Sequence, residues 1–178
     1  MLVTPQDPVR ARTLLDEAAA IAAEVGNRDA SALAQSLLGE VLDTVGDHLS
    51  AARMRLTLAE QSFASGDRFF AWGSLFGAAK NLNDVGDHEA AHMIGVWVWR
   101  QALSGGFDTG RGKAAYADFE TDFDRSVRNE FGRLEPLVAG MTDIDVRALA
   151  RDRIRHHELL AGITVRDTAE RGDPGSTS

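Results

Sequence analysis

The segment His88-Glu89-Ala90-Ala91-His92 has the spacing in this chain that most suggests chemistry. On a helix, H-E-x-x-H places two imidazoles one turn apart, where they can hold Zn²⁺ while the glutamate acts as general base. The longer form of the motif needs a third histidine at position 98, which is Val98. Glu89 also suits the first turn of a helix, where the dipole favours acidic residues. The sequence therefore favours a helix start without metal or cofactor, and a zinc hydrolase is the enzymatic alternative.

Two charged clusters and a glycine-rich stretch are weaker candidates. The glycine-rich stretch 105–112 lacks the lysine of a phosphate loop and is interpreted as a linker. The acidic cluster alternates with Phe119 and Phe123, which favours a solvated helix face over a cation site. The basic cluster is diluted by acidic residues, which favours a solvated face or an internal partner for the acidic helix. The acidic cluster consists of Asp118, Glu120, Asp122 and Asp124. The basic cluster consists of Arg147, Arg151, Arg153, Arg155, His156 and His157.

Composition restricts the class of protein. The chain has 178 residues, no cysteine and a formal net charge of −8, so disulfides and thiolate chemistry are excluded. An acidic surface repels phosphate backbones and anionic lipid, so neither nucleic acid nor membrane is an expected partner. The first eight residues show no basic and then apolar signal segment, and a cytoplasmic location is expected.

The elements that must position these residues are helices at a regular period. Gly26, Gly46, Gly66 and Gly86 fall 20 residues apart and are followed by Asn or Asp, which predicts helix ends followed by capped helix starts. Superposing 26–65 on 66–105 gives nine identities, where chance gives roughly two or three. The repeat unit is therefore about 40 residues and two helices, predicted as 28–45 with 47–65 and 68–85 with 87–104.

Further helices flank the repeats. Asp7-Pro8 predicts the start of a first helix that runs to about Val25, so helical repeats span about 8–104. C-terminal helices are expected within 113–160: one over 113–131, a short one at 134–138 disturbed by Pro136, and a last one over 143–160. The sequence predicts one domain over 1–165 and a disordered tail over 166–178.

Residues 32–65 and 72–105 resemble tetratricopeptide-type repeats. Each has a Gly-Asp turn, an alanine five residues later (Ala51, Ala91) and a small residue seven before the turn (Gly39, Ala79). The longer period and the segment from Trp72 to Val146 resemble the C-terminal region of large ATP-binding, LuxR-type or cyclase-linked actinobacterial transcription regulators. The resemblance implies an all-α, right-handed superhelix of antiparallel hairpins with extra C-terminal helices. The nucleotide-binding and DNA-binding parts are missing, so a scaffold is what remains.

The expected function is a non-catalytic protein-interaction scaffold, a regulatory remnant or sensor-type module of a bacterial regulator. In such repeats the first helix of each hairpin lines the concave face. Carrying the spacing over from that resemblance implies eight residues on this face: Ser36, Glu40, Asp43, Thr44, Phe76, Lys80, Asn83 and Asp84. The partner is not identified, and a small ligand on this face is left open.

A purely structural, self-associating helical protein is the other alternative. The 87–104 helix is apolar nearly all round, and Trp97 and Trp99 point to different sides of it. Helices 68–85 and 113–131 are expected to cover two flanks, the latter through Tyr116, Phe119 and Phe123. The remaining tryptophan predicts a homodimer, unless helix 143–160 closes over it through Ile144, Val146, Leu149 and Ile154.

Overall fold

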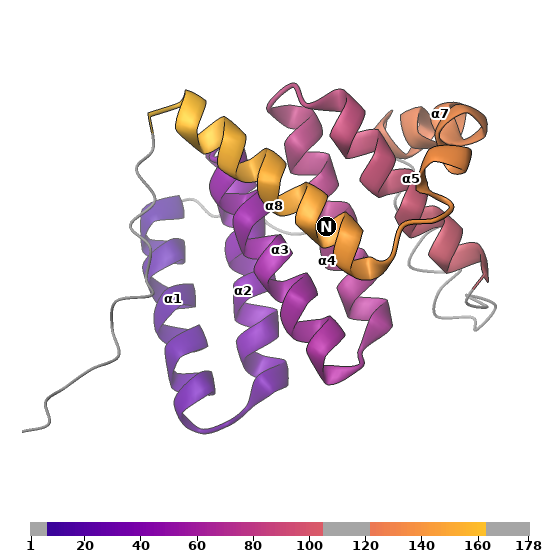
Figure 1. Ribbon diagram of the computed structural model, residues 1–178. Helices are drawn as coiled ribbons and strands as arrows, with labels where there is room; N and C mark the ends of the chain where they lie inside the picture. Colours follow the sequence, from indigo (N-terminus) through magenta and orange to yellow (C-terminus); the bar gives the residue numbers. More distant parts are fainter. Residues whose placement is uncertain (1–6, 105–121, 163–178) are drawn as a thin grey trace, which may run out of the picture.

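The computed structural model describes residues 7–104 and 122–162, which form seven helices and no strand (Figure 1). This confirms the all-α class. The helices are α1 (Pro8–Glu24), α2 (Arg28–Thr44), α3 (His48–Ser65), α4 (Arg68–Asp84), α5 (His88–Ser104), α7 (Asp122–Val138) and α8 (Asp143–Leu160). The predicted bounds of the first five agree closely with these. Tyr116, Phe119 and the tail 166–178 lie outside the described residues.

The turns have the predicted chemistry. Gly26, Gly46, Gly66 and Gly86 all have positive φ, between 71° and 91°, a conformation that a side chain at Cβ disfavours. The next residue then caps the following helix: Asn27 accepts from Ala30 N–H and Asp67 from Phe70 N–H. The 20-residue glycine period therefore corresponds to the positions where the chain reverses.

Helices α1 to α5 lie side by side in chain order, and the last two helices cover the stack (Figure 1). The most extensive contact joins α3 to α4, across the boundary between the two predicted hairpins. Helix α7 packs against α5, while α8 crosses α3, α4 and α5 on one side. The stack is therefore continuous, with its C-terminal part covered by elements that do not belong to the repeat.

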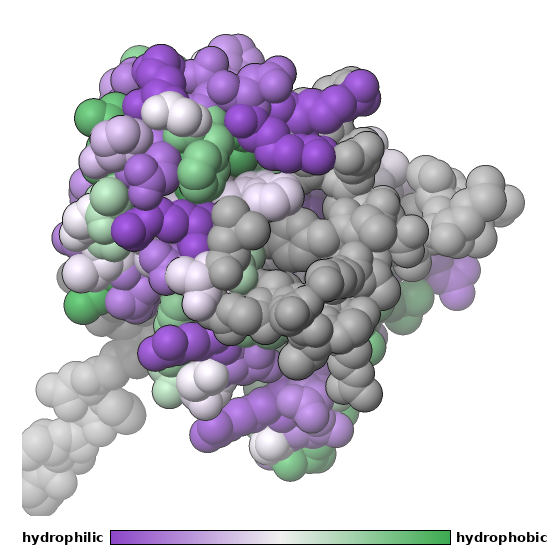
Figure 2. All heavy atoms as spheres, turned by 90° about the vertical axis from the view of Figure 1, so that its right-hand side faces the viewer, coloured by the Kyte–Doolittle hydropathy of each residue, from purple (hydrophilic) through white to green (hydrophobic). Residues whose placement is uncertain are grey.

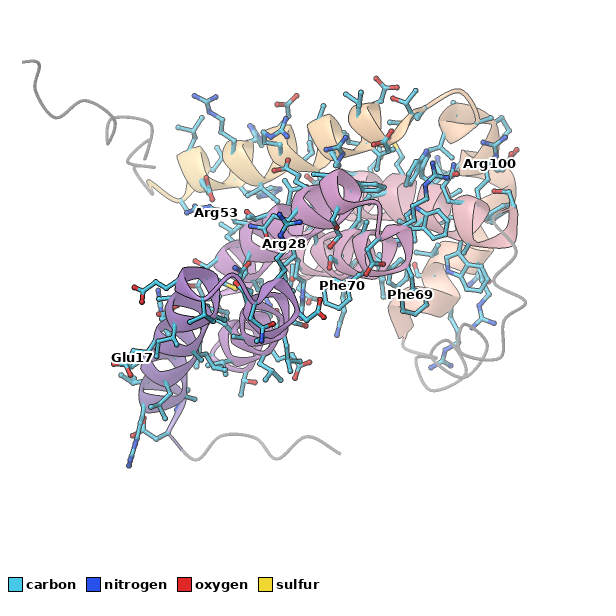
Figure 3. The ribbon with its side chains drawn as sticks, turned by 90° about the horizontal axis from the view of Figure 1, so that it is seen from below. Glu17, Arg28, Arg53, Phe69, Phe70 and Arg100 are labelled. Carbon is cyan, nitrogen blue, oxygen red and sulfur yellow. The ribbon has the colours of Figure 1, made fainter. Side chains whose placement is uncertain are left out.

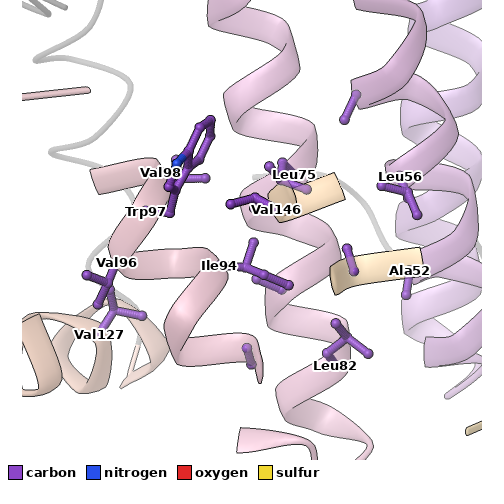
Figure 4. Close-up of a cluster of buried hydrophobic side chains, with 14 of the residues drawn as sticks. Ala52, Leu56, Leu75, Leu82, Ile94, Val96, Trp97, Val98, Val127 and Val146 are labelled. Carbon is purple, nitrogen blue, oxygen red and sulfur yellow. The ribbon is translucent and has the colours of Figure 1, made fainter. Parts of the chain in front are cut away.

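The larger hydrophobic core lies where α3, α4, α5, α7 and α8 meet (Figure 4). Leu75, Ile94 and Val146 are fully buried there and come from three different helices. A second, smaller cluster under α1 and α2 contains Leu38, Leu42 and Ala51. The hydrophobic stabilisation is thus concentrated in the C-terminal part of the stack.

A glycine in α5 allows α7 to approach closely. A Cβ placed on Gly95 would lie 2.7 Å from Cγ2 of Val127, a separation that packed atoms do not tolerate. Val127 is fully buried, and Phe123, one turn earlier in α7, is also buried. The predicted cover of the 87–104 helix through Phe123 is therefore present.

Helix α7 differs from the prediction at its end. A break before a separate short helix at 134–138 was expected, whereas α7 continues to Val138 with Pro136 inside it. Proline removes the backbone hydrogen bond to the carbonyl four residues earlier and crowds that carbonyl, and in α7 this cost is confined to the last turn. Leu134 and Val138, on either side of Pro136, are both fully buried and fix the last turn in place.

A largely buried arginine joins α2, α3 and α4. The Arg55 guanidinium on α3 donates to Asp43 Oδ2 on α2 at 2.7 Å and to Asn81 Oδ1 on α4 at 2.5 Å. The Asn81 side-chain amide, itself 0% exposed, donates to the other Asp43 oxygen. Each of these polar groups therefore has partners inside the protein, as buried polar groups require.

Two glycines make room for this arginine. A Cβ on Gly77 would lie 2.7 Å from Arg55 Cδ, and one on Gly39 would lie 3.5 Å from its Nε. Arg55 thus runs between α2 and α4 at positions where both helices lack a side chain.

We expect Gly77→Ala to destabilise the protein by about 1–3 kcal/mol, because the new methyl group clashes with a side chain held at both Asp43 and Asn81. Gly73→Ala is the matched control on the same helix, since a Cβ there meets nothing within 4 Å. The control should stabilise the protein by about 0.5–1 kcal/mol through helix propensity. Urea unfolding of both variants measures the difference, and equal effects would contradict the assigned role of Arg55.

Candidate functional site

The eight residues predicted for a concave binding face on α2 and α4 do not form one free surface. Thr44 and Lys80 are exposed, whereas Ser36 and Glu40 are half-buried. Phe76 lies against the core, with its ring 5.3 Å from that of Phe123 on α7. The structure therefore places part of the predicted face under α7.

Asp43 is the clearest departure from that prediction. Both of its carboxylate oxygens are bonded inside the protein, to Arg55 and to Asn81. His48 adds a further contact at 3.4 Å through Nδ1 and lies 3.8 Å from Asp84 on α4. An acidic residue on a helix face looked available in the sequence because Arg55 and Asn81 are distant from it along the chain.

The zinc-like segment has two histidines that serve different neighbours. His88 Nδ1 lies 2.8 Å from Asn83 Oδ1, equivalent to the contact that His48 makes with Asp43 in the preceding repeat. His92 Nε2 lies 2.7 Å from Ser126 Oγ on α7. No group of three potential metal ligands occurs among residues 7–104 and 122–162.

His92 is placed as a packing residue. Its ring stacks on Phe123 with centroids 5.8 Å apart. Burial lowers the pKa of His92, an effect that Glu130 opposes and that His88 and Arg133 reinforce. The neutral imidazole therefore suits the contact between α5 and α7.

The two tryptophans proposed for self-association have different environments. Trp97 is 3% exposed, and its indole N–H donates to the Met141 carbonyl at 2.9 Å, in the connection from α7 to α8. Trp99 is half-buried, with the Arg128 guanidinium 5.8 Å from its ring centroid. Trp97 is thus covered internally and does not offer an exposed contact. Val146, Leu149 and Ile154 of α8 belong to the same core, as the alternative predicted, whereas Ile144 is 66% exposed and takes no part.

Helix α8 is attached to the stack by an ionic contact at the turn before α5. Asp87 is 5% exposed and accepts from Arg153 Nε at 2.6 Å and from Arg153 Nη2 at 3.0 Å. His157 Nε2 lies 3.1 Å from the same carboxylate. Burial raises the pKa of Asp87, but the hydrogen bonds from Arg153 and His157 outweigh it and hold the pKa below its ordinary value.

Further ionic contacts join α8 to α3. Arg53 donates through Nε at 2.7 Å to Glu158, which is 3% exposed, and Figure 3 shows Arg53 on the side of α3 that faces α8. Arg151 pairs with Glu60. The basic residues of this helix were expected in solvent or against an acidic helix. Arg151, Arg153 and His157 instead pair with residues of the repeats, which no local pattern in the sequence indicated. Arg147 pairs with Asp143 of its own helix, and Arg155 and His156 are exposed, as expected for a solvated face.

A pocket of about 310 Å³ lies between α3, α4, α5 and the start of α8, and sequence patterns did not indicate it. Aromatic rings from three helices provide its apolar part, while one arginine and several uncharged polar groups provide hydrogen-bond donors. The lining residues are Phe63, Arg68, Trp72, Trp97, Gln101, Met141, Thr142 and Asp143.

The other end of the stack exposes an apolar stripe. Leu14 and Ile21 on α1 are 54% and 61% exposed, Val25, which caps the end of α1, is 72% exposed, and Ala18 is exposed as well. In contrast, hydrophilic residues predominate over the described part of the face beyond α5 and α7 (Figure 2). A contiguous apolar stripe on one helix face marks an interaction surface more strongly than scattered apolar residues do.

We expect Asp87→Asn to lower the free energy of unfolding at pH 7 by about 1.5–3 kcal/mol, the range for hydrogen bonds to a charged group. Because the folded-state pKa of Asp87 is lowered, its carboxylate stabilises the fold above the ordinary value of 3.8. That contribution disappears as the pH falls through the folded-state pKa. The variant and the wild type should therefore converge in stability under acidic conditions.

Asp67→Asn is the control, because Asp67 caps α4 from the equivalent position, is exposed and does not pair with Arg153 or His157, and asparagine caps equally well. Urea unfolding as a function of pH should show little change for Asp67→Asn. A pH dependence that is the same in Asp87→Asn and wild type would contradict the role of Asp87.

Purified protein dialysed against a chelator is expected to hold far less than one zinc per chain. The reason is that His88 and His92 have separate partners at Asn83 and Ser126. Elemental analysis after re-exposure to zinc, with His88→Ala as the matched variant, measures this. Stoichiometric zinc in the wild type, lost in His88→Ala, would overturn the expectation.

No helix in the described ranges is both long enough and apolar enough to cross a membrane. Comparisons with protein-family models, curated proteins and solved structures find no match for this chain.

Proposed function

We propose that this chain is a non-catalytic protein-interaction scaffold, built on a tetratricopeptide-like superhelix, whose main docking surface is the outer side of α1. The observation that carries the proposal is the exposed stripe Leu14, Ala18, Ile21 and Val25. These residues recur at intervals of three and four, so they lie on one side of the helix.

The two ends of the stack differ in a way that supports this assignment. At the C-terminal end, Val127 of α7 packs against α5. The connection between α7 and α8 accepts a hydrogen bond from Trp97 of α5, and Arg153 of α8 pairs with Asp87. At the N-terminal end, α1 packs mainly against α2. Fully burying a leucine, isoleucine or valine side chain contributes about 1.5–3 kcal/mol, so covering the stripe offers a substantial driving force.

The predicted face on α2 and α4 is secondary in this proposal. Thr44 and Lys80 are exposed and offer polar contacts, whereas Asp43 and Phe76 serve the fold. The resemblance to the C-terminal region of bacterial regulators favours a regulatory protein as the class of partner for these polar contacts.

The zinc hydrolase is the enzymatic alternative, and the geometry of its two histidines supports the scaffold instead. His92 is directed to Ser126 and Phe123 on α7, while His88 contacts Asn83 at the end of α4. A catalytic zinc requires its ligands to converge on one point with an open position for water.

Photo-crosslinking tests the proposed surface. A photoreactive amino acid in place of Ile21 should capture a protein in a native lysate, whereas the same group in place of exposed Arg155 on α8 should not. Excess wild-type chain should suppress the product by competition. Excess Leu14→Glu/Ile21→Glu should not suppress it, because charges on the stripe prevent docking. Equal capture at both positions, or none at Ile21, would contradict the proposal.

A further inference from the structure

The exposed stripe on α1 belongs to a heptad pattern. Ala11, Leu14, Ala18, Ile21 and Val25 follow one another at intervals of three, four, three and four, the spacing of the apolar seam in paired helices. Leu15 and Ala22, on one flank of this seam, pack towards α2. The seam itself is therefore available to a further helix on the side away from α2.

A row of charges occupies the other flank. Arg10, Glu17 and Glu24 are seven residues apart, and all three are exposed. Figure 3 shows Glu17 pointing away from the rest of the molecule at the outer side of α1. In paired helices such flanking charges determine which partner and which orientation are accepted.

We infer that the occupant of this surface is α1 of a second copy, paired antiparallel about a two-fold axis near residues 16 and 17. This assignment rests on the proposed function of the stripe and names its partner. In this arrangement Arg10 of each copy lies opposite Glu24 of the other, which gives two ionic pairs. Glu17 meets its own equivalent at the axis, an exposed position where water and salt screen the repulsion.

The apolar residues fit the same register. Leu14 lies opposite Ala18 of the second copy, and Ile21 lies opposite Ala11, so these two large side chains each meet a small one. Val25 lies opposite Asp7, at the edge of the paired region. Large against small permits a close helix–helix distance, near the lower end of the usual 8–10 Å. The antiparallel arrangement also places the positive end of each helix dipole beside the negative end of the other.

A parallel pair lacks these contacts. It would direct the row of Arg10, Glu17 and Glu24 towards the flank of Leu15 and Ala22, which is apolar and already packs towards α2. The charge pattern therefore favours the antiparallel pair. Two-fold pairing also joins the helical stacks of the two copies at α1 and covers the apolar stripe of both, so no third copy can add there.

The size of the surface predicts a weak dimer. With 17 residues, α1 is about 26 Å long. One pair of such helices covers less than the roughly 800 Å² per partner of a standard stable interface. We therefore expect a monomer–dimer equilibrium with a dissociation constant on the order of micromolar or weaker.

Analytical ultracentrifugation over roughly a hundredfold range of concentration tests the equilibrium. The wild type should shift from monomer to dimer, and Leu14→Glu should be monomeric throughout. Arg10→Glu and Glu24→Arg should each weaken the dimer by about tenfold, because both ionic pairs become repulsive. The double variant Arg10→Glu/Glu24→Arg restores the pairs with reversed sign and should recover wild-type association.

Ala20→Glu is the control on the same helix, since Ala20 is exposed but lies about 120° from the seam. Circular dichroism should show that every variant keeps its helical content. A wild type that is monomeric throughout, or a double variant that stays as weak as the single ones, would overturn the inference.

Site-directed crosslinking tests the orientation. Because the chain has no cysteine, only the introduced cysteines can react. A short bismaleimide should link Glu17→Cys to itself, across the axis. Arg10→Cys and Glu24→Cys should each crosslink poorly alone and efficiently when mixed. Efficient self-linking at all three positions would indicate a parallel pair and contradict the antiparallel one.

The outcomes separate this inference from the proposed function. If the wild type is monomeric while the photoreactive group at Ile21 captures a different protein, the second copy is excluded and the scaffold stands. If the wild type is monomeric and nothing is captured, both are contradicted.

Discussion

The Arg55 side chain determines how neighbouring helices of this stack lie against one another. It extends from α3 between Gly39 of α2 and Gly77 of α4, and its guanidinium contacts Asp43 and Asn81 on those helices. Apolar contacts tolerate small displacements, whereas hydrogen bonds to a charged group depend steeply on distance and angle. A buried charge without partners is costly, so slippage of either helix along its axis is penalised. The alanine-rich helices of the repeat therefore obtain a defined register from one polar centre.

A second polar centre fixes what packs on the stack. Asp87 occupies the same position in its turn as Asp47 and Asp67, and all three cap a helix. Only Asp87 also receives Arg153 and His157 from α8. One residue of the repeat thus serves both the local helix start and the long-range attachment. Together with the packing of α7 against Gly95, this attachment covers the C-terminal end of the stack and makes it different from the N-terminal end.

The parts of the structure that could be predicted from the sequence are those encoded locally. Four glycines followed by capping residues gave the helix bounds, because a positive-φ residue and a cap act within a few residues. The docking of α8 could not be predicted, since Arg53 and Glu158 lie 105 residues apart. The assignment of Asp43 to a binding face failed for the same reason. Helical spacing shows which residues share a side of a helix, but it does not show which neighbour covers that side.

Tryptophan placement illustrates the same limit. The sequence established that Trp97 and Trp99 lie on different sides of α5, and left open whether a second subunit or α8 covers the remaining one. Residues of α8 share the core with Trp97, and the Met141 carbonyl that accepts its indole N–H lies in the short connection between α7 and α8. An irregular connection carries no periodic signal. Likewise, Pro136 suggested a break in α7 because the burial of Leu134 and Val138, which stabilises the last turn, was not visible in the sequence.

The uneven distribution of the core connects the fold to binding at α1. The larger hydrophobic cluster unites α3, α4, α5, α7 and α8, whereas α1 and α2 rest on a small cluster around Leu38, Leu42 and Ala51. A segment with few buried apolar contacts opens at lower free energy than the rest of the protein. Any partner that binds α1 only in its packed form therefore stabilises the α1–α2 hairpin by mass action. Because Asp43 of α2 contacts Arg55, order gained at α1 reaches the polar centre between α2 and α4 through directly contacting residues. Binding at the open end and order within the stack are in this way thermodynamically linked.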